Sequence, residues 1–182
     1  MGKPGVFYRK SLRLRGYDYT HEGGYSITLV THNRECIFGK MVGDQVELSN
    51  YGLIAREEWL SSEVIRKEVE LFEDEFVIMP NHVHGIVWII PKDNVGATGQ
   101  SPLRQEVDVK HGPKPKSLGS FIVGYKTSDT TRVNRFRSSP GKLVWNRNYH
   151  DRIIRNEREL TTIRKYIQEN PLKWVLDRHY IR

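Results

Sequence analysis

The sequence predicts an α+β protein in which helices pack on a mostly antiparallel sheet. Three observations support this prediction: several short stretches have strand-like composition, three longer stretches carry apolar residues at helical spacing, and the two kinds of element do not alternate regularly. The chain of 182 residues is long enough for one domain with a core of its own.

The predicted strands are short and are bounded by turn residues. A β-branched, alternating stretch predicts a strand that turns near Asn33 and continues, and a break at Pro80-Asn81 separates two further strands. The last of these is apolar on both faces apart from its histidines, which is typical of a central strand. The predicted strands are Tyr25–Phe38, Gln45–Leu48, Phe76–Met79 and His82–Ile90, and an extended segment follows within 143–154.

The three predicted helices follow from apolar spacing and capping residues. Apolar residues three and four apart predict helices over Ile54–Phe72 and from Ser117 to about Phe136. Asn156 is a good N-cap with Glu159 three residues later, which resembles a capping box, and Pro171 ends this third helix at about Asn170.

Composition also divides the chain into regions. We expect a basic N-terminal arm over 1–22, a single folded domain over 23–175 and a C-terminal tail over 176–182. Within the domain, the stretch 91–116 is rich in Gly, Pro and polar residues without periodicity, so we expect a flexible loop there.

Several classes of protein are excluded by composition. Cys36 is the single cysteine, which argues against a disulfide framework and against a thiolate metal cluster. The longest apolar run, from Gly85 to Ile90, is too short to cross a membrane, and the N-terminus does not resemble a signal peptide. We therefore expect a cytoplasmic protein, associated with the nucleoid if it binds DNA.

Charge is distributed unevenly along the chain. The net charge is +7, yet residues 44–76 hold 10 acidic side chains against 3 basic ones, whereas residues 110–182 hold 17 basic against 6 acidic. One basic face for a polyanion fits this asymmetry, and a solvated basic surface fits it too. The candidate DNA-binding residues are Arg9, Lys10, Arg13, Arg15, Arg132, Arg135, Arg147, Arg152 and Arg155.

His82 and His84 are the first candidate site residues. Residues two apart on a strand point to the same face, so both imidazoles could hold a divalent cation through one nitrogen each. Oxygen ligands from a phosphate would suit Mg²⁺ or Mn²⁺. Taken alone, the same pair also fits two structural histidines.

Tyr166 and Asn170 lie four residues apart on the third predicted helix and so share one face. The Asn170 side-chain oxygen can ligate a hard cation, and a phenol close to a cation becomes a usable nucleophile. A core tyrosine and a plain helix terminus explain these two residues equally well on spacing alone.

Three segments that occur in a fixed order favour the functional interpretation of these residues. Val77-Ile-Met-Pro-Asn-His82-Val-His84 resembles the HUH motif of the single-tyrosine transposases of IS200-like elements. Tyr166-Ile-Gln-Glu-Asn170-Pro171 is similar to the Tyr-Ile-x-x-Asn-Pro helix of the branch called REP-associated tyrosine transposases. Between them, the stretch from Trp145 to Tyr149 is similar to that branch's Trp-Gln-x-x-Tyr segment, although Asn146 stands where the branch often has Gln.

The resemblance implies a ferredoxin-like (RRM-like) palm and a specific chemistry. It implies that a tyrosine attacks single-stranded DNA beside a hairpin, forms a 5′-phosphotyrosine link and frees a 3′-hydroxyl without an external energy source. Carried over by motif, His82, His84 and Asn170 are the metal ligands for Mg²⁺ or Mn²⁺ and Tyr166 is the nucleophile. Mobile relatives are dimers whereas this branch includes monomers, so a homodimer remains open.

Alternatives remain at this point. Tyr125 is a rival nucleophile on the helix after the histidines, with Asp129 instead of an amide four residues on, and Tyr149 ranks behind it as a packing or DNA-contacting residue. Two other functions also fit: a domesticated, non-catalytic DNA- or RNA-binding protein of the same fold, and a metal phosphodiesterase that uses water.

Overall fold

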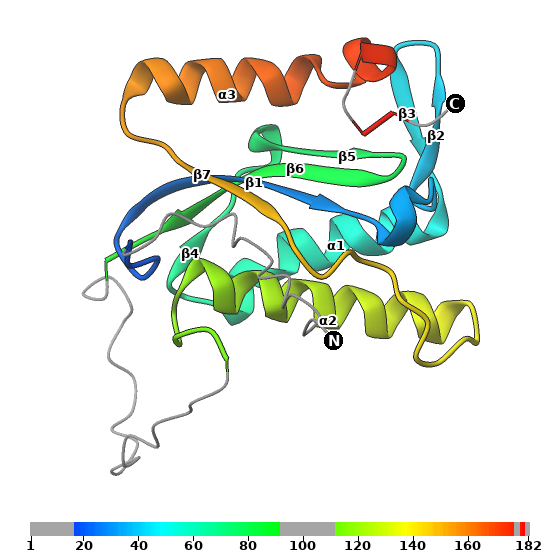
Figure 1. Ribbon diagram of the computed structural model, residues 1–182, viewed down its shortest axis with the longest axis horizontal. Helices are drawn as coiled ribbons and strands as arrows, with labels where there is room; N and C mark the ends of the chain where they lie inside the picture. The colour runs from blue at the N-terminus through cyan, green and yellow to red at the C-terminus, as the bar shows by residue number, and fades with distance from the viewer. Residues whose placement is uncertain (1–16, 92–111, 177–178, 181–182) are drawn as a thin grey trace, which may run out of the picture.

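The computed structural model describes residues 17–91, 112–176 and 179–180, and it confirms the predicted α+β class. A five-stranded antiparallel sheet lies between two layers of helix (Figure 1). Helices α1 (Asn50–Ile65) and α2 (Leu118–Phe136) cover one face, and α3 (Glu157–Glu169) covers the other. Within these ranges, no helix is both long and apolar enough to span a membrane.

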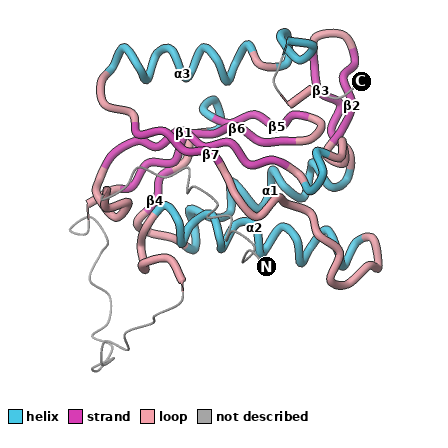
Figure 2. The backbone as a smooth tube through the Cα atoms, in the orientation of Figure 1, coloured by secondary structure: helices cyan, strands magenta, loops and turns pink. Residues whose placement is uncertain are grey.

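The sheet is built around its two longest strands, β1 (Gly23–Val30) and β6 (His82–Ile89), which pair antiparallel over their full length (Figure 2). β7 (His150–Ile153) pairs with the other edge of β1, and β4 (Val69–Glu70) and β5 (Phe76–Met79) both pair with β6. The order β5-β6-β1-β7, with α1 and α2 as the connecting helices, is the expected ferredoxin-like arrangement.

The first strand is shorter than predicted. β1 ends at Val30, and a single 3₁₀ turn, η1 (His32–Arg34), follows, in which Asn33 has a φ of 53°. Residues 35–38, where the continuation was expected, form no strand, and a hairpin of β2 (Gly39–Val42) and β3 (Gln45–Leu48) follows, whose second strand was predicted. The Thr31 amide still donates to the backbone oxygen of Asn81, and Thr31 forms an isolated bridge with Trp145. Its hydroxyl contacts the backbone oxygens of Glu35 and Asn81, which ties the start of the turn to the strand end.

The predicted helix over Ile54–Phe72 is wrong at both ends. α1 begins at Asn50, after the N-cap Ser49, and ends at Ile65. Val69 fits the helical spacing but is buried in the sheet as part of β4, opposite Ile89. Apolar spacing could not decide whether Val69 lies in a helix or in a strand, because either placement buries its side chain.

The other two helices begin where their capping residues predict. Ser117 forms a complete capping box with Ser120 at the start of α2. The Asn156 side chain accepts from the Glu159 amide at the start of α3, but the Glu159 carboxylate accepts from the amide of Arg155 instead of Asn156. A 3₁₀ helix, η4 (Pro171–Leu176), follows α3 after Asn170.

Alternation along β6 divides the protein into two apolar clusters. Val83, Val87 and Ile89 belong to the large core beneath the sheet, which α1 and α2 cover. Ile86 points the other way and packs with Leu160, Ile163 and Ile167 of α3. The larger cluster also explains Gly85, since a Cβ there would meet the ring of Trp59 at 2.6 Å.

The structure describes only part of the expected arm, loop and tail. Residues 1–16 of the arm and 92–111 of the loop lie outside the described residues, and with them Arg9, Lys10, Arg13 and Arg15. Tyr17 and Tyr19, although placed in the predicted arm, pack against the large core. His179, although placed in the predicted tail, is buried. The packed domain therefore includes residues from both predicted extensions.

Asp129 is a buried carboxyl group on α2, fully enclosed by the core. It accepts a hydrogen bond from the indole of Trp145, with 2.7 Å between Nε1 and Oδ2. Burial raises the pKa of Asp129 from 3.8 to about 7, and the Trp145 bond offsets only part of that shift. The folded protein therefore binds a proton here at pH values where the unfolded chain has lost it.

We expect the Asp129 carboxyl to make stability fall as the pH rises from about 4 to about 7, because a group with a raised folded pKa loses its stabilising proton over that interval. Asp129→Asn keeps an acceptor for Trp145 and cannot titrate, so its unfolding free energy in urea should be flatter over this range. The exposed Asp74→Asn variant is the control. A wild-type profile parallel to that of Asp129→Asn would contradict the prediction.

Candidate functional site

The histidine pair lies on β6, on the face that α3 covers. β5 and β6 meet in a two-residue turn, so His82 pairs with Met79 and directly follows Pro80 and Asn81. Both imidazoles are buried, and their ring centroids are 4.6 Å apart. The predicted strand and its period of two therefore place the two rings side by side, as the spacing indicated.

His84 contacts a different element through each ring nitrogen. Its Nδ1 lies 2.8 Å from the hydroxyl of Thr28, the residue directly opposite on β1. Its Nε2 lies 3.2 Å from the phenol oxygen of Tyr166 on α3, and the two rings meet edge to face at 5.0 Å. The sheet thus orients the imidazole and the helix brings a phenol to it.

His82 is oriented by its neighbour in the chain. The Asn81 amide nitrogen donates to the backbone oxygens of Arg34 and His179, at 3.1 and 2.7 Å, so its side-chain oxygen faces His82. That oxygen lies 2.8 Å from Nδ1 of His82. Since a carbonyl oxygen only accepts, Nδ1 carries the proton and Nε2 carries the lone pair, which is the tautomer that a metal ligand needs.

The segment after α3 encloses the histidines. The ring of Trp174 in η4 stacks on His82 at 5.8 Å, and the ring of His179 lies 4.9 Å from that of His82. Asn170 caps α3 between Tyr166 and Trp174, and it is buried with 2% of its surface exposed. The candidate ligand Asn170 therefore sits at the junction of two segments that both contact the histidine pair.

Tyr166 differs from its surroundings in being accessible. It is 44% exposed, whereas His82, His84 and Asn170 are buried. A half-exposed phenol in contact with a buried imidazole can meet a large substrate without any rearrangement of the core. Of the four candidate residues of this site, Tyr166 is therefore the accessible one.

The position of Tyr125 argues against it as a nucleophile. Tyr125 is 2% exposed on α2, beneath the sheet, and its hydroxyl donates to the backbone oxygen of Ala55 at 3.1 Å. Burial raises its pKa well above the ordinary value, which disfavours the phenolate. Tyr149 is partly buried and lies beneath the ammonium group of Lys126, in line with the packing role considered for it.

The candidate DNA-binding arginines that the structure describes belong to different elements. Arg132 on α2 pairs with Glu57 and Glu58 of α1, on the face opposite the histidines, and Arg135 is exposed on that same helix. Arg152 pairs with Glu159, while Arg147 and Arg155 are exposed. Arg132 is therefore paired with two carboxylates of α1, and its contact with DNA stays a prediction.

Four residues of this site were absent from the predicted set: Thr28, Asn81, Trp174 and His179. Asn81 precedes the first histidine, so its proximity was visible in the sequence. Thr28 depended on the register between β1 and β6, and His179 on the return of the chain end to the sheet. Among the described residues, no group of three or more His, Cys, Asp or Glu side chains is arranged to hold a metal.

A solved structure shares this fold. The chain superposes on the structure of a REP-associated tyrosine transposase bound to a REP hairpin with a TM-score of 0.58 and 17% identity, over 88% of this chain and 73% of that one. The chain therefore shares the fold of that REP-associated tyrosine transposase, which is the fold that the three motifs predicted.

Sequence comparison places the chain more closely. It is 35% identical over 178 residues to an uncharacterized protein of Haemophilus influenzae, covering 97% of this chain and 96% of the relative. The chain belongs to the same family as that Haemophilus protein. No protein-family model matches it.

We expect Asn81→Ala to destabilise the protein by about 2 kcal/mol or more, because the change removes the side-chain hydrogen bonds to the buried His179 oxygen, to the partly buried Arg34 oxygen and to the His82 N–H. Unfolding in urea, followed by circular dichroism, measures this loss. The exposed Asn148→Ala variant is the control, and equal unfolding free energies for the two variants would contradict the role given to Asn81.

Proposed function

We propose that this protein is a metal-dependent, single-stranded DNA nicking and joining enzyme of the transposase type, in which Tyr166 is the nucleophile. The contact between Tyr166 and His84 carries the proposal, since it joins an accessible phenol to a buried histidine pair at 3.2 Å. The shared fold with a REP-associated tyrosine transposase adds support.

The residues present fit a divalent metal. The hydrogen bond from His82 to Asn81 leaves Nε2 as its donor atom, and Thr28 can accept a proton from Nδ1 of His84 in the same way. Nε2 of His82 and His84, with the side-chain oxygen of Asn170, would hold Mg²⁺ or Mn²⁺, and the metal would take the position at Nε2 of His84 that the Tyr166 phenol contacts in this structure. When bound, the metal supplies positive charge against the oxygens of the scissile phosphate.

The proposed reaction exchanges one phosphate ester for another. The Tyr166 oxygen attacks the phosphorus, a bond from phosphorus to tyrosine oxygen forms, and the bond from phosphorus to the 3′ oxygen breaks. The phenol proton passes to solvent and the 3′ oxygen takes one up, so a 3′-hydroxyl and a 5′-phosphotyrosine remain. Because the new ester preserves the phosphoester bond, a 3′-hydroxyl can reverse the step and join strands.

The proposed substrate is single-stranded DNA beside a hairpin. The solved relative of this fold is bound to a REP hairpin, and the chain carries a net charge of +7, which favours a polyanion. The exposed Arg147 and Arg155 are the described candidates for phosphate contacts. Since Tyr166 and both histidines belong to one chain, the chemistry does not require a second copy.

We expect Tyr166→Phe to abolish the covalent adduct with a hairpin oligonucleotide, because the change removes only the attacking oxygen. Binding of the same oligonucleotide should change by no more than about twofold. A denaturing gel with labelled single-stranded hairpin DNA from the protein's own genomic flanks measures the adduct, and a filter assay measures binding.

Tyr125→Phe is the matched control for this experiment. It removes a hydroxyl from the core, costs about 1 kcal/mol of stability and should leave the adduct unchanged. An adduct that survives Tyr166→Phe would refute the assignment. DNA binding without any wild-type adduct would identify a non-catalytic binding protein, and cleavage without a protein–DNA link would identify a phosphodiesterase that uses water.

We expect a chelator to abolish adduct formation by the wild-type protein, and Mg²⁺ or Mn²⁺ to restore it, because two neutral imidazoles and an amide bring no charge of their own to the phosphate. The double variant His82→Ala with His84→Ala should not respond to added metal. An adduct of equal yield in chelator and in metal would contradict the proposed metal site.

A further inference from the structure

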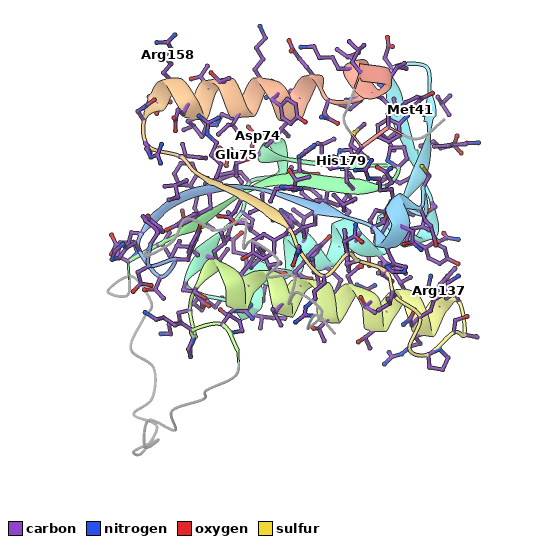
Figure 3. The ribbon with its side chains drawn as sticks, in the orientation of Figure 1. Met41, Asp74, Glu75, Arg137, Arg158 and His179 are labelled. Carbon is purple, nitrogen blue, oxygen red and sulfur yellow. The ribbon has the colours of Figure 1, made fainter. Side chains whose placement is uncertain are left out.

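We infer that Glu75, Arg164 and Trp88 form a latch that positions α3, and with it Tyr166, against the histidine pair. The effect on catalysis rests on the proposed function, whereas the positioning of the helix does not. Glu75 ends the 3₁₀ turn η2 (Glu73–Glu75) that precedes β5, on the side of the sheet that faces α3 (Figure 3). Arg164 lies two residues before Tyr166 on α3, and Trp88 lies on β6.

The Glu75 carboxylate is held from both sides. Nε of Arg164 donates to Oε1 of Glu75 at 2.7 Å, and a terminal guanidinium nitrogen lies 2.6 Å from the same oxygen. The indole nitrogen of Trp88 donates to Oε2 at 2.6 Å. The carboxylate therefore links the helix to the same strand that carries the histidines.

Burial makes this link costly to break. The Glu75 side chain is 1% exposed, whereas the surface ion pairs of α3, such as Lys165 with Glu169, are accessible to water. A buried charge that loses its partner carries a penalty far larger than an exposed one does. The protein therefore keeps a buried carboxylate between the sheet and α3, and a partly exposed Arg164 and the indole of Trp88 satisfy it.

The latch supplies what the apolar contacts of α3 lack. Leu160, Ile163 and Ile167 pack on Ile86, and such contacts favour burial without specifying a single rotation or shift of the helix. Hydrogen bonds are directional, so they can set that position. Trp88 stands four residues from His84 on β6, about 13 Å along the strand, so two well separated points of the same strand are linked to α3.

Loss of the latch should therefore affect chemistry more than binding. A displacement of about 1 Å in a reacting group can cost up to about a hundredfold in rate, whereas DNA contacts spread over a surface tolerate it. Glu75 and Arg164 do not touch the proposed reacting atoms, so we assign them as positioning residues and Tyr166 as the residue that they position.

The test compares Arg164→Met with Lys165→Met in the full-length protein. Both variants remove one positive charge from adjacent positions of α3, but only the first breaks the latch. Two measurements are made on each: hydrogen exchange of the α3 amides against those of β1, and the single-turnover rate of adduct formation at saturating hairpin DNA. Glu75→Gln, which keeps the shape of the side chain, is a second latch variant.

We expect Arg164→Met and Glu75→Gln to raise exchange in α3 by about tenfold or more while β1 stays near its wild-type rate. The adduct rate should fall about tenfold or more and the hairpin dissociation constant should stay within about twofold. Arg164→Lys, which restores the charge without the fork of donors, should recover part of the rate.

Three results would overturn the latch. They are α3 exchange equal to that of Lys165→Met, a uniform rise in exchange over α3 and β1, and a loss of DNA binding as large as the loss of rate. A wild-type protein without any adduct would instead refute the proposed function, and the exchange of α3 would still decide whether Glu75 and Arg164 hold the helix.

Discussion

The alternation of side chains along β6 is the constraint on which the rest of this structure depends. Odd-numbered residues of the strand fill the large core under the sheet, and even-numbered residues face α3. His82 and His84 are even-numbered, so they occupy the thinner layer, where a helix can leave a phenol half-exposed. A shift of one residue in register would bury the histidines under α1 and α2 and would place Val83 in the site.

The two layers of the protein serve different purposes. Beneath the sheet, Trp59, Phe121 and Tyr125 form a closely packed aromatic core that holds β1 and β6 in register. Above it, the cluster around Ile86 is small, and buried polar groups such as Asn81 and Glu75 do much of the positioning. This division puts rigidity in the sheet that bears the histidines and directional contacts where the helix must be placed.

Hydrogen bonds between buried polar groups connect the two histidines to the elements that form the sheet. Asn81 joins His82 to the turn after β1 and to the returning C-terminal segment, and Thr28 joins His84 to β1. Each imidazole is therefore oriented by a residue whose place is set by the sheet. The same strands that form the core thus determine the tautomer of His82 and the direction of both rings.

Local sequence was enough for some features and not for others. Capping residues located the starts of α2 and α3, and period-two spacing put the two histidines on one face, because both depend on residues close together in the chain. The end of α1, the burial of Tyr125 and the pairing of Arg132 with α1 depended on which distant surfaces meet, and apolar or charged spacing alone fits several outcomes. The approach of Tyr166 to His84, and the contacts of Thr28, Glu75 and His179, were decided by strand register and helix packing, since these join residues between 13 and 98 positions apart.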